Sequence, residues 1–225
     1  MATDVSAVTA EQLARRHDAE ELVDGIRARL REERERRLAF YDWLDEDRKA
    51  EFIDGEVVVH SPVVKSHADA SKLLTLLLNV HAIKGGLGWV GTEKILVQLK
   101  RDDFEPDVVF WRSEVAADFK ADQLFFPPPH FVAEVLSPST AGYDREQKYA
   151  SYAANGVPEY WIVDAKARVV ECYELGERGA YRLRERVNAD GTLTSTAVRG
   201  FSVPALAIYD ERVNLEVVTS IVSAT

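Results

Sequence analysis

The apolar positions follow a helical period in three segments of the chain. Apolar residues recur every three to four positions from Leu22 to Leu44, which predicts a long helix within the first fifty residues. A second helix is expected from 66 to about 83, where Gly85-Gly86 ends it. A third is expected from about 143 to 154, closed by Asn155-Gly156.

Short apolar runs between these segments predict strands. Asp54-Gly55 favours a hairpin within residues 51–60, because glycine accepts a positive φ at little cost. The other runs are 89–99, 107–111, 131–136, 159–164, 168–174, 181–187 and 192–198. The core order is therefore helix, three strands, helix, strand. It predicts an α/β (α+β) fold with a central mixed sheet flanked by helices, followed by extra antiparallel strands.

Composition indicates a globular protein with a helical appendage. The chain has 225 residues, 46% of them apolar and 29% charged. We expect an N-terminal helical extension, residues 1–48, and one domain, residues 49–225. The single cysteine, Cys172, excludes an internal disulfide. Since no apolar run has the length of a membrane span and no signal pattern is visible, we expect a cytoplasmic protein with no membrane partner.

The charge balance argues against a protein that coats a polyanion. The net charge is −10, and from residue 51 onward 18 basic residues face 25 acidic ones. Candidates for contact with a nucleic-acid backbone are Arg178 and the alternating Arg182, Arg184 and Arg186, which we expect to share one face of a strand. An edge strand protected by charge is the alternative explanation.

Two acids interrupt strands that are otherwise apolar. Asp107 follows Pro106 and begins the run Val-Val-Phe-Trp, and Glu134 stands inside Phe-Val-Ala-Glu-Val-Leu. A buried, unpaired carboxylate costs several kcal/mol, so each acid needs a cation, hydrogen-bond donors or a solvent-filled cleft. Oxygen ligands without a His/Cys cluster suit Mg²⁺ or Mn²⁺ better than zinc. A structural alternative is that Asp107 begins a strand and that Glu134 pairs with Lys148 or an arginine.

Lys148 lies on the helix predicted after the third strand. Asp144 precedes it by one turn, and Tyr152 follows on the same face. If this helix packs against the sheet, the ammonium reaches the two acids, where it can orient an attacking water. A local surface pair between Asp144 and Lys148 is the alternative.

Several motifs together resemble one protein family. They are Glu51 with Asp54-Gly55-Glu56, His67 at a helix start, Pro106-Asp107-Val-Val, Val132-Ala-Glu134-Val-Leu-Ser-Pro-Ser-Thr140, Asp144-Arg-Glu-Gln-Lys148 and Gly156-Val-Pro-Glu-Tyr-Trp-Ile-Val-Asp164. This set resembles the Uma-two (Uma-type) family of restriction endonucleases, within the PD-(D/E)XK nuclease superfamily. The resemblance covers residues 45 to 210 and leaves out the N-terminal helix.

The resemblance implies a restriction-endonuclease-like core with one metal site at the strand ends. It implies that Asp107 and Glu134, with the Val135 carbonyl, hold Mg²⁺ (or Mn²⁺) and that Lys148 positions the attacking water. Lys148 would replace the superfamily lysine two residues after the second acid, where this chain has Leu136. Glu51 and Glu56 are further acids of the family pattern, and either could complete the metal shell. We count Glu51 with the catalytic residues and Glu56 with the metal ligands.

The activity that the resemblance implies is hydrolysis of phosphodiester bonds in DNA. A homodimer is expected, because cutting two strands with single-metal sites suits paired subunits. The alternative is a nuclease-fold protein with weak or no catalysis that acts as a binding or assembly module. A two-carboxylate glycosidase is disfavoured, because Lys148 would have no role in it. His67 matches the family, although a histidine at a helix start is more often structural.

Overall fold

The structure, a computed structural model, describes residues 9–45, 48–137 and 140–224. The chain divides into two compact units, residues 1–45 and 46–225, three residues before the boundary expected from the sequence. The first unit contains helices α1 (Ala10–Ala14) and α2 (Ala19–Trp43), and α2 is the long helix that the apolar period predicted. Thr9 caps α1, since its hydroxyl accepts from the Gln12 amide and the Gln12 side chain accepts from the Thr9 amide.

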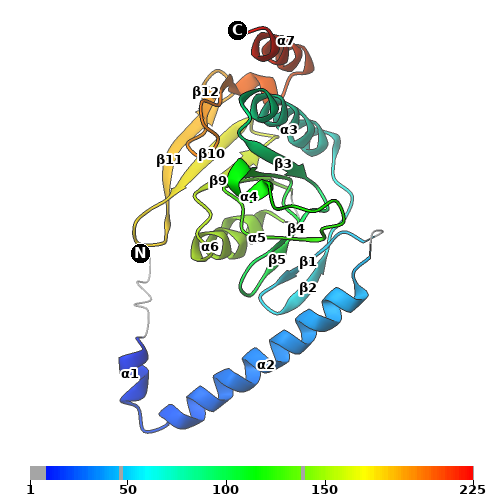
Figure 1. Cartoon of the computed structure of the whole chain (residues 1–225). Helices are drawn as coiled ribbons and strands as arrows, with labels where there is room; N and C mark the ends of the chain where they lie inside the picture. The colour runs from blue at the N-terminus through cyan, green and yellow to red at the C-terminus, as the bar shows by residue number, and fades with distance from the viewer. Residues whose placement is uncertain (1–8, 46–47, 138–139, 225) are drawn as a thin grey trace. The chain divides into compact units, whose positions relative to one another are not determined.

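The second unit is built on a six-stranded mixed sheet (Figure 1). Its strands lie in the order β11-β10-β9-β8-β6-β3, and β8 and β9 are its parallel pair. The chain crosses from β8 to β9 through helices α5 (Ala141–Arg145) and α6 (Gln147–Ala154). The strands are β3 (Gly88–Thr92), β6 (Val108–Arg112), β8 (Phe131–Val135), β9 (Glu159–Asp164), β10 (Val169–Leu175) and β11 (Tyr181–Asn188).

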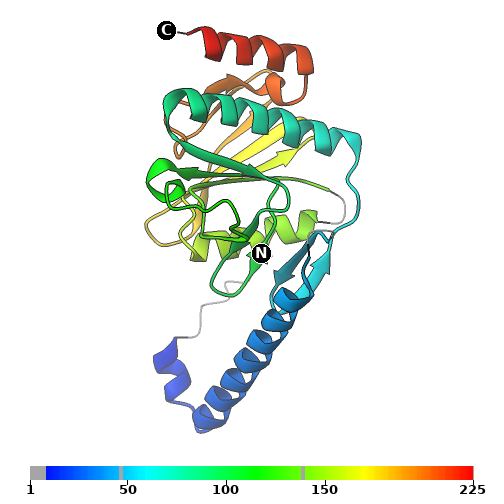
Figure 2. The ribbon, with the colours of Figure 1, turned by 45° about the vertical axis from the view of Figure 1, so that its right-hand side comes forward.

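Helices cover both faces of this sheet (Figure 2). On one face, α3 (Lys65–Gly85) packs with the 3₁₀ helix η1 (Ala205–Ile208) and with α7 (Glu211–Ser223). On the other face, Tyr152 and Ala153 of α6 belong to a second apolar cluster. The predicted order of helix, three strands, helix and strand is confirmed, and so is the mixed sheet between helices. No helix in the described ranges is both long and apolar enough to span a membrane.

A second sheet of five short strands, which the sequence pattern did not predict, packs beside the first (Figure 1). Its order is β2-β1-β5-β4-β7, and β1 and β2 form the expected hairpin around Asp54-Gly55. The remaining elements are β1 (Ala50–Ile53), β2 (Glu56–Val59), β4 (Leu96–Gln98), β5 (Asp103–Phe104), β7 (Phe125–Phe126), α4 (Ser113–Ala116), β12 (Thr192–Thr194) and β13 (Ser202–Pro204).

The backbone interrupts two segments that the pattern predicted to be continuous. The segment 89–99 forms β3 and β4, because Glu93 and Lys94 adopt φ values of 30° and 53° and turn the chain into the second sheet. The helix predicted from 143 to 154 divides at Glu146, whose φ of −120° and ψ of −77° are not helical. The C-terminal helix α7 was not predicted.

The three arginines of β11 do not share one face, contrary to the expectation from their alternation. The register between β10 and β11 shifts between Cys172 and Tyr173, so Arg184 is the extra residue of a bulge. Arg182 therefore lies opposite Glu174, and Arg186 lies opposite Glu171. Residues 171 and 174 of one strand point to opposite faces, so the two outer arginines do so as well.

The Arg184 guanidinium is surrounded by acids. Its Nη2 lies 3.5 Å from Glu159 and 2.8 Å from Glu185, and its Nε lies 3.6 Å from Glu174. The β11 arginines thus neutralise neighbouring glutamates and do not form a continuous cationic row.

Glu159, at the start of β9, anchors the loop after β12. Its side chain is fully buried, and its Oε2 accepts hydrogen bonds from the Ser195 hydroxyl at 2.6 Å and from the Thr196 and Ala197 amides at 2.9 and 2.8 Å. Its Oε1 accepts from the Trp161 indole at 2.8 Å. One carboxylate therefore satisfies four donors from two segments of the chain, which ties the loop to β9.

Glu159→Gln is expected to lower the free energy of unfolding by about 3 kcal/mol, since the NH₂ group that replaces one carboxylate oxygen cannot accept from the donors on its side. Urea denaturation followed by circular dichroism measures the change. Glu177→Gln, at an exposed turn position, is the matched control and should stay within about 0.5 kcal/mol of wild type. Equal unfolding midpoints for the two variants would contradict the anchoring role.

Candidate functional site

Asp107 and Glu134, the two acids that interrupt apolar strands, meet at one end of the six-stranded sheet, where β6 begins and β8 ends. Val108 of β6 pairs with Ala133 of antiparallel β8, so continuing the register by one residue places Asp107 opposite Glu134. Both residues fall on the face of the sheet that carries Val109 and Val132. Directly opposed carboxylates repel each other unless cations or donors compensate them.

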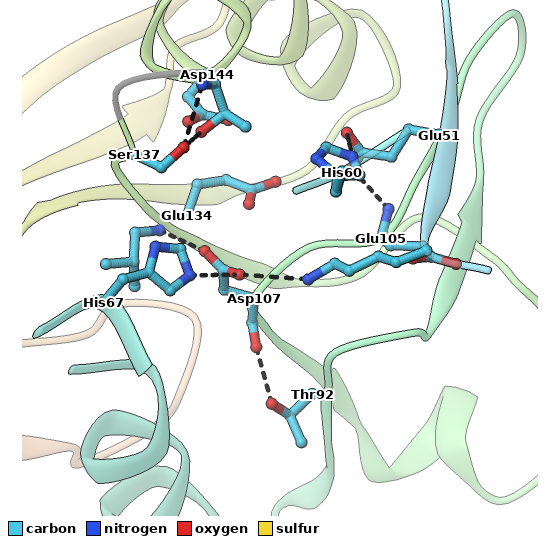
Figure 3. Close-up of polar contacts among 12 residues, drawn as sticks. Glu51, His60, His67, Thr92, Glu105, Asp107, Glu134, Ser137 and Asp144 are labelled. Atoms are coloured by element: carbon cyan, nitrogen blue, oxygen red, sulfur yellow. Dashed lines mark hydrogen bonds and ion pairs between the residues drawn. The ribbon is translucent and has the colours of Figure 1, made fainter. Parts of the chain in front are cut away.

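Asp107 is fixed by contacts to both of its carboxylate oxygens (Figure 3). His67 Nε2 lies 3.2 Å from Oδ1, and the Val135 amide donates to Oδ2 at 2.7 Å. The Lys49 ammonium lies 3.9 Å from Oδ1. Burial disfavours the charged form, but the His67 and Val135 contacts outweigh it and lower the pKa of Asp107. The Asp107 side chain is thereby held ionised and in one orientation.

The Lys148 ammonium lies among three carboxylates. It is 2.8 Å from Glu51 Oε1, 3.0 Å from Glu134 Oε1 and 3.6 Å from Asp144 Oδ1, and only 3% of its side chain is exposed. Burial opposes its charge, but the attraction of these acids outweighs burial and raises the pKa of Lys148 well above its ordinary value. The ion pair with Asp144 is therefore buried and is not the local surface pair that spacing alone allowed.

Glu134 has one cationic neighbour and several anionic ones. Burial raises the pKa of Glu134 well above its ordinary value, Lys148 opposes this rise, and the charge of Asp144 adds to it. The Tyr152 hydroxyl donates to Glu134 Oε1 at 3.1 Å. Tyr152 is fully buried, so it supports this carboxylate from inside the core.

The second sheet contributes two more acids. Glu51 of β1 is fully buried, and its Oε2 lies 2.8 Å from His60 Nε2 while its Oε1 accepts from the Glu105 amide at 2.8 Å. Lys148 and His60 together lower the pKa of Glu51 despite its burial. Burial and the Glu51 charge raise the pKa of Glu105 to about 7. No hydrogen-bond donor from the described residues meets Glu105 Oε2.

Most of these side chains line one pocket of about 200 Å³; Glu51 is not a lining residue but contacts the pocket-lining Lys148. In Figure 3, His67, Glu134 and Asp144 surround the same space as Asp107. The available oxygen donors suit Mg²⁺ or Mn²⁺, which one or two carboxylates hold together with water and substrate phosphate. No cluster of three His, Cys, Asp or Glu residues with metal-binding geometry occurs within residues 9–45, 48–137 and 140–224, so a complete protein cage is not preformed there.

The structure brings together four of the five expected site residues: Asp107, Glu134, Lys148 and Glu51. Glu56 is not among the residues that line the pocket. It is exposed beside the hairpin turn. Glu51 lies opposite Val58 on β2, and Glu56 is two residues, about 7 Å, away from Val58 along that strand.

Sequence reasoning did not identify Glu105, His60 or Lys49 as site residues. The hairpin register offered a clue to two of them, because extending the pairing of Ala50 with Val59 by one residue places His60 beside Lys49. The sequence offered one indication for Glu105, namely that it lies two residues before Asp107. Its position depends on the pairing of β5 with β1, which no local pattern indicates.

Glu105→Gln is expected to change the pH dependence of stability. The pKa of Glu105 is about 7 in the folded chain against an ordinary value of 4.5, so the unfolded chain ionises first as the pH rises. This group therefore reduces the free energy of unfolding as the pH increases from about 4.5 to 7. Relative to wild type, the variant should gain on the order of 2 kcal/mol over that interval.

Urea denaturation at a series of pH values, with EDTA present, measures this gain. Glu114→Gln, at an exposed position, is the matched control and should show no such pH-dependent difference. The same difference from wild type at pH 5 and pH 8 would contradict the raised pKa of Glu105.

Known proteins share both the sequence pattern and the fold. Residues 37–208 match the Uma2 family, described as "Putative restriction endonuclease". Two Synechocystis proteins, "Uncharacterized protein slr1290" and "Uncharacterized protein sll1609", are 30% and 29% identical over 144 and 136 residues. These alignments cover 62% and 58% of this chain and 74% and 75% of the relatives.

A solved structure supports the fold assignment. The crystal structure of a "putative nuclease belonging to DUF820" from Anabaena variabilis superposes with a TM-score of 0.64 at 12% identity, covering 76% of this chain and 94% of that one. The restriction-endonuclease-like fold expected from the resemblance is thus confirmed. The family match spans well over half of the chain, which therefore belongs to the Uma2 family of restriction-endonuclease-type proteins.

Proposed function

We propose that the protein is a divalent-metal-dependent DNA endonuclease that hydrolyses phosphodiester bonds. One observation carries the proposal: Asp107 and Glu134 lie opposite each other at a strand end and line a pocket, and a buried ammonium lies 3.0 Å from Glu134. The family description and the fold of a nuclease structure support the class of reaction.

The charges around the pocket favour an added cation. Five acids line or adjoin it, whereas Lys148 and Lys49 are the lysines within 4 Å of these acids in the described ranges. Buried carboxylates without compensation are costly, and burial already raises the pKa of Glu134. We assign Asp107 and Glu134 as ligands of Mg²⁺ or Mn²⁺. The ion would lower the pKa of a bound water and neutralise charge on the scissile phosphate.

The chain's own residues position the remaining groups. His67 and the Val135 amide hold both oxygens of Asp107, and Tyr152 with Lys148 holds Glu134 Oε1. Lys148 lines the pocket and donates a hydrogen bond to the water that attacks phosphorus, while Glu51 keeps the ammonium in place from the opposite side. The attack forms one P–O bond and breaks another; the attacking water releases a proton to solvent, and the leaving oxygen takes one up from solvent.

The substrate and the oligomeric state follow from the same chemistry. We propose DNA as the substrate, and a homodimer as the active form, because one metal site per chain cuts one strand. The acidic balance of the chain requires that phosphate contacts be confined to the neighbourhood of the pocket.

Asp107→Asn and Glu134→Gln are each expected to reduce plasmid nicking by at least about 100-fold, because each removes a charged ligand. Nicking with Mg²⁺ or Mn²⁺ and metal binding by calorimetry are the measurements. Asp118→Asn and Glu216→Gln, at exposed positions, are the matched controls and should behave as wild type. If wild type neither binds metal nor nicks DNA, the binding or assembly module becomes the better description.

Lys148→Met is expected to abolish nicking while metal binding persists, since it removes the water-orienting ammonium and retains both ligands. Thermal melting by circular dichroism shows whether the variant folds without its buried cation. Lys120→Met, at an exposed position, is the matched control. Nicking by a folded Lys148→Met protein at the wild-type rate would exclude the proposed role of the lysine.

Glu51 and Glu56 can be distinguished by parallel substitution to glutamine. Glu51→Gln should lower the nicking rate at least about tenfold, because it weakens the contact that holds Lys148. Glu56→Gln should retain the wild-type rate, because Glu56 is exposed and outside the pocket. The opposite ranking would show that the hairpin tip reaches the metal during the reaction.

A further inference from the structure

A second pocket, of about 620 Å³, opens beside β3 and α4. Its lining includes the side chains of Trp89, Phe119, Leu124 and Phe126. Lys94 and Lys120 are its charged lining residues, and no acid is among the described residues that line it. Both charged side chains that line this pocket are cationic, although the net charge of the chain is −10.

The aromatic side chains of this pocket form a rigid cluster. Trp89 stacks on Phe126 with ring centroids 5.4 Å apart, and Phe119 meets both rings edge-on at 5.6 and 5.2 Å. Trp111 stacks beneath Trp89 at 5.5 Å and is fully buried. Trp89 itself is 37% exposed, and Leu124 is 68% exposed. Trp89 is thus the most exposed ring of the cluster, and the buried rings around it hold it in place.

This aromatic pocket lies on the same face of the sheet as the candidate catalytic residues. Trp89 pairs with Trp111, and Trp111 and Asp107 share a face of β6 because they are four residues apart. Four residues of strand correspond to about 13 Å. The turn after β3 connects the two pockets: the Thr92 hydroxyl donates to the Asp107 carbonyl at 2.9 Å, and Lys94 is close enough for its charge to act on Glu105.

We propose that the aromatic pocket binds an unpaired nucleobase of the substrate strand, with Lys94 and Lys120 contacting the adjacent phosphates. Every nucleobase presents a flat π-face, and proteins that bind single strands combine such stacking surfaces with cationic side chains. The inference rests on the proposed function and specifies its substrate: DNA with a single-stranded or opened segment a few nucleotides from the scissile phosphate.

Fluorescence anisotropy of a labelled oligothymidylate, with full-length protein and EDTA, tests the proposal. Wild type should bind this strand more tightly than a blunt duplex of the same length, and tryptophan emission should be quenched on binding. Trp89→Leu should weaken binding about tenfold, the loss of one base stack. Lys120→Glu should weaken binding several-fold without disturbing the fold, since Lys120 is exposed. Lys166→Glu, an exposed position on another turn, makes the same charge change and should bind as wild type.

Two results would overturn the proposal. The first is equal affinity of the Lys120→Glu and Lys166→Glu proteins for the oligothymidylate. The second is a loss of dimer in the Lys120→Glu protein, measured by sedimentation, with unchanged oligothymidylate binding, which would identify the pocket as an interface between copies. Because no divalent cation is present, the outcome is independent of cleavage. Binding in this pocket by a protein that never nicks DNA would contradict the proposed function alone.

Discussion

The Lys148 ammonium holds the acidic residues of the pocket together. It is buried, and carboxylates from β1, β8 and α5 all lie within 3.6 Å of it. Without this cation, three acids from separate elements would repel one another in a medium of low dielectric constant. The position of α6 against the sheet is therefore coupled to the arrangement of the acids. The same contact fixes Glu134, and with it the electrostatics that favour a divalent ion at the strand end.

The acids nevertheless lie in different environments, and their pKa values therefore shift in different directions. Asp107 receives a backbone donor and an imidazole, which lower its pKa. Burial dominates at Glu134 and at Glu105 and raises both pKa values. A set of carboxylates in which some are held ionised and others resist ionisation is a recurring feature of hydrolytic sites. Here the difference arises from the donors that each carboxylate meets, since Asp107 and Glu105 come from the same segment between β5 and β6.

The distribution of charge makes an acidic nuclease physically reasonable. The arginines that seemed available on β11 neutralise neighbouring glutamates, because a bulge separates them. The two pockets are each lined by lysines, including Lys49 in one and Lys94 in the other. Local potential steers a polyanion more effectively than net charge when the cations line a concave surface.

The sequence by itself determined the central sheet, its flanking helices and the principal acids, because these depend on local periodicity and on polar residues within apolar strands. The spacing of Asp144, Lys148 and Tyr152 predicted one helix face; the helix divides at Glu146, yet Lys148 still lies 3.6 Å from Asp144. Only the tertiary structure decided that Glu51, and not Glu56, contacts Lys148 beside the pocket, since this depends on how the β1–β2 hairpin pairs with β5. The same holds for Glu105, for the bulge at Arg184 and for the aromatic pocket, each of which arises from contacts between segments distant in sequence. Local patterns specify which face of an element is apolar, but the register between elements is settled only when their side chains pack.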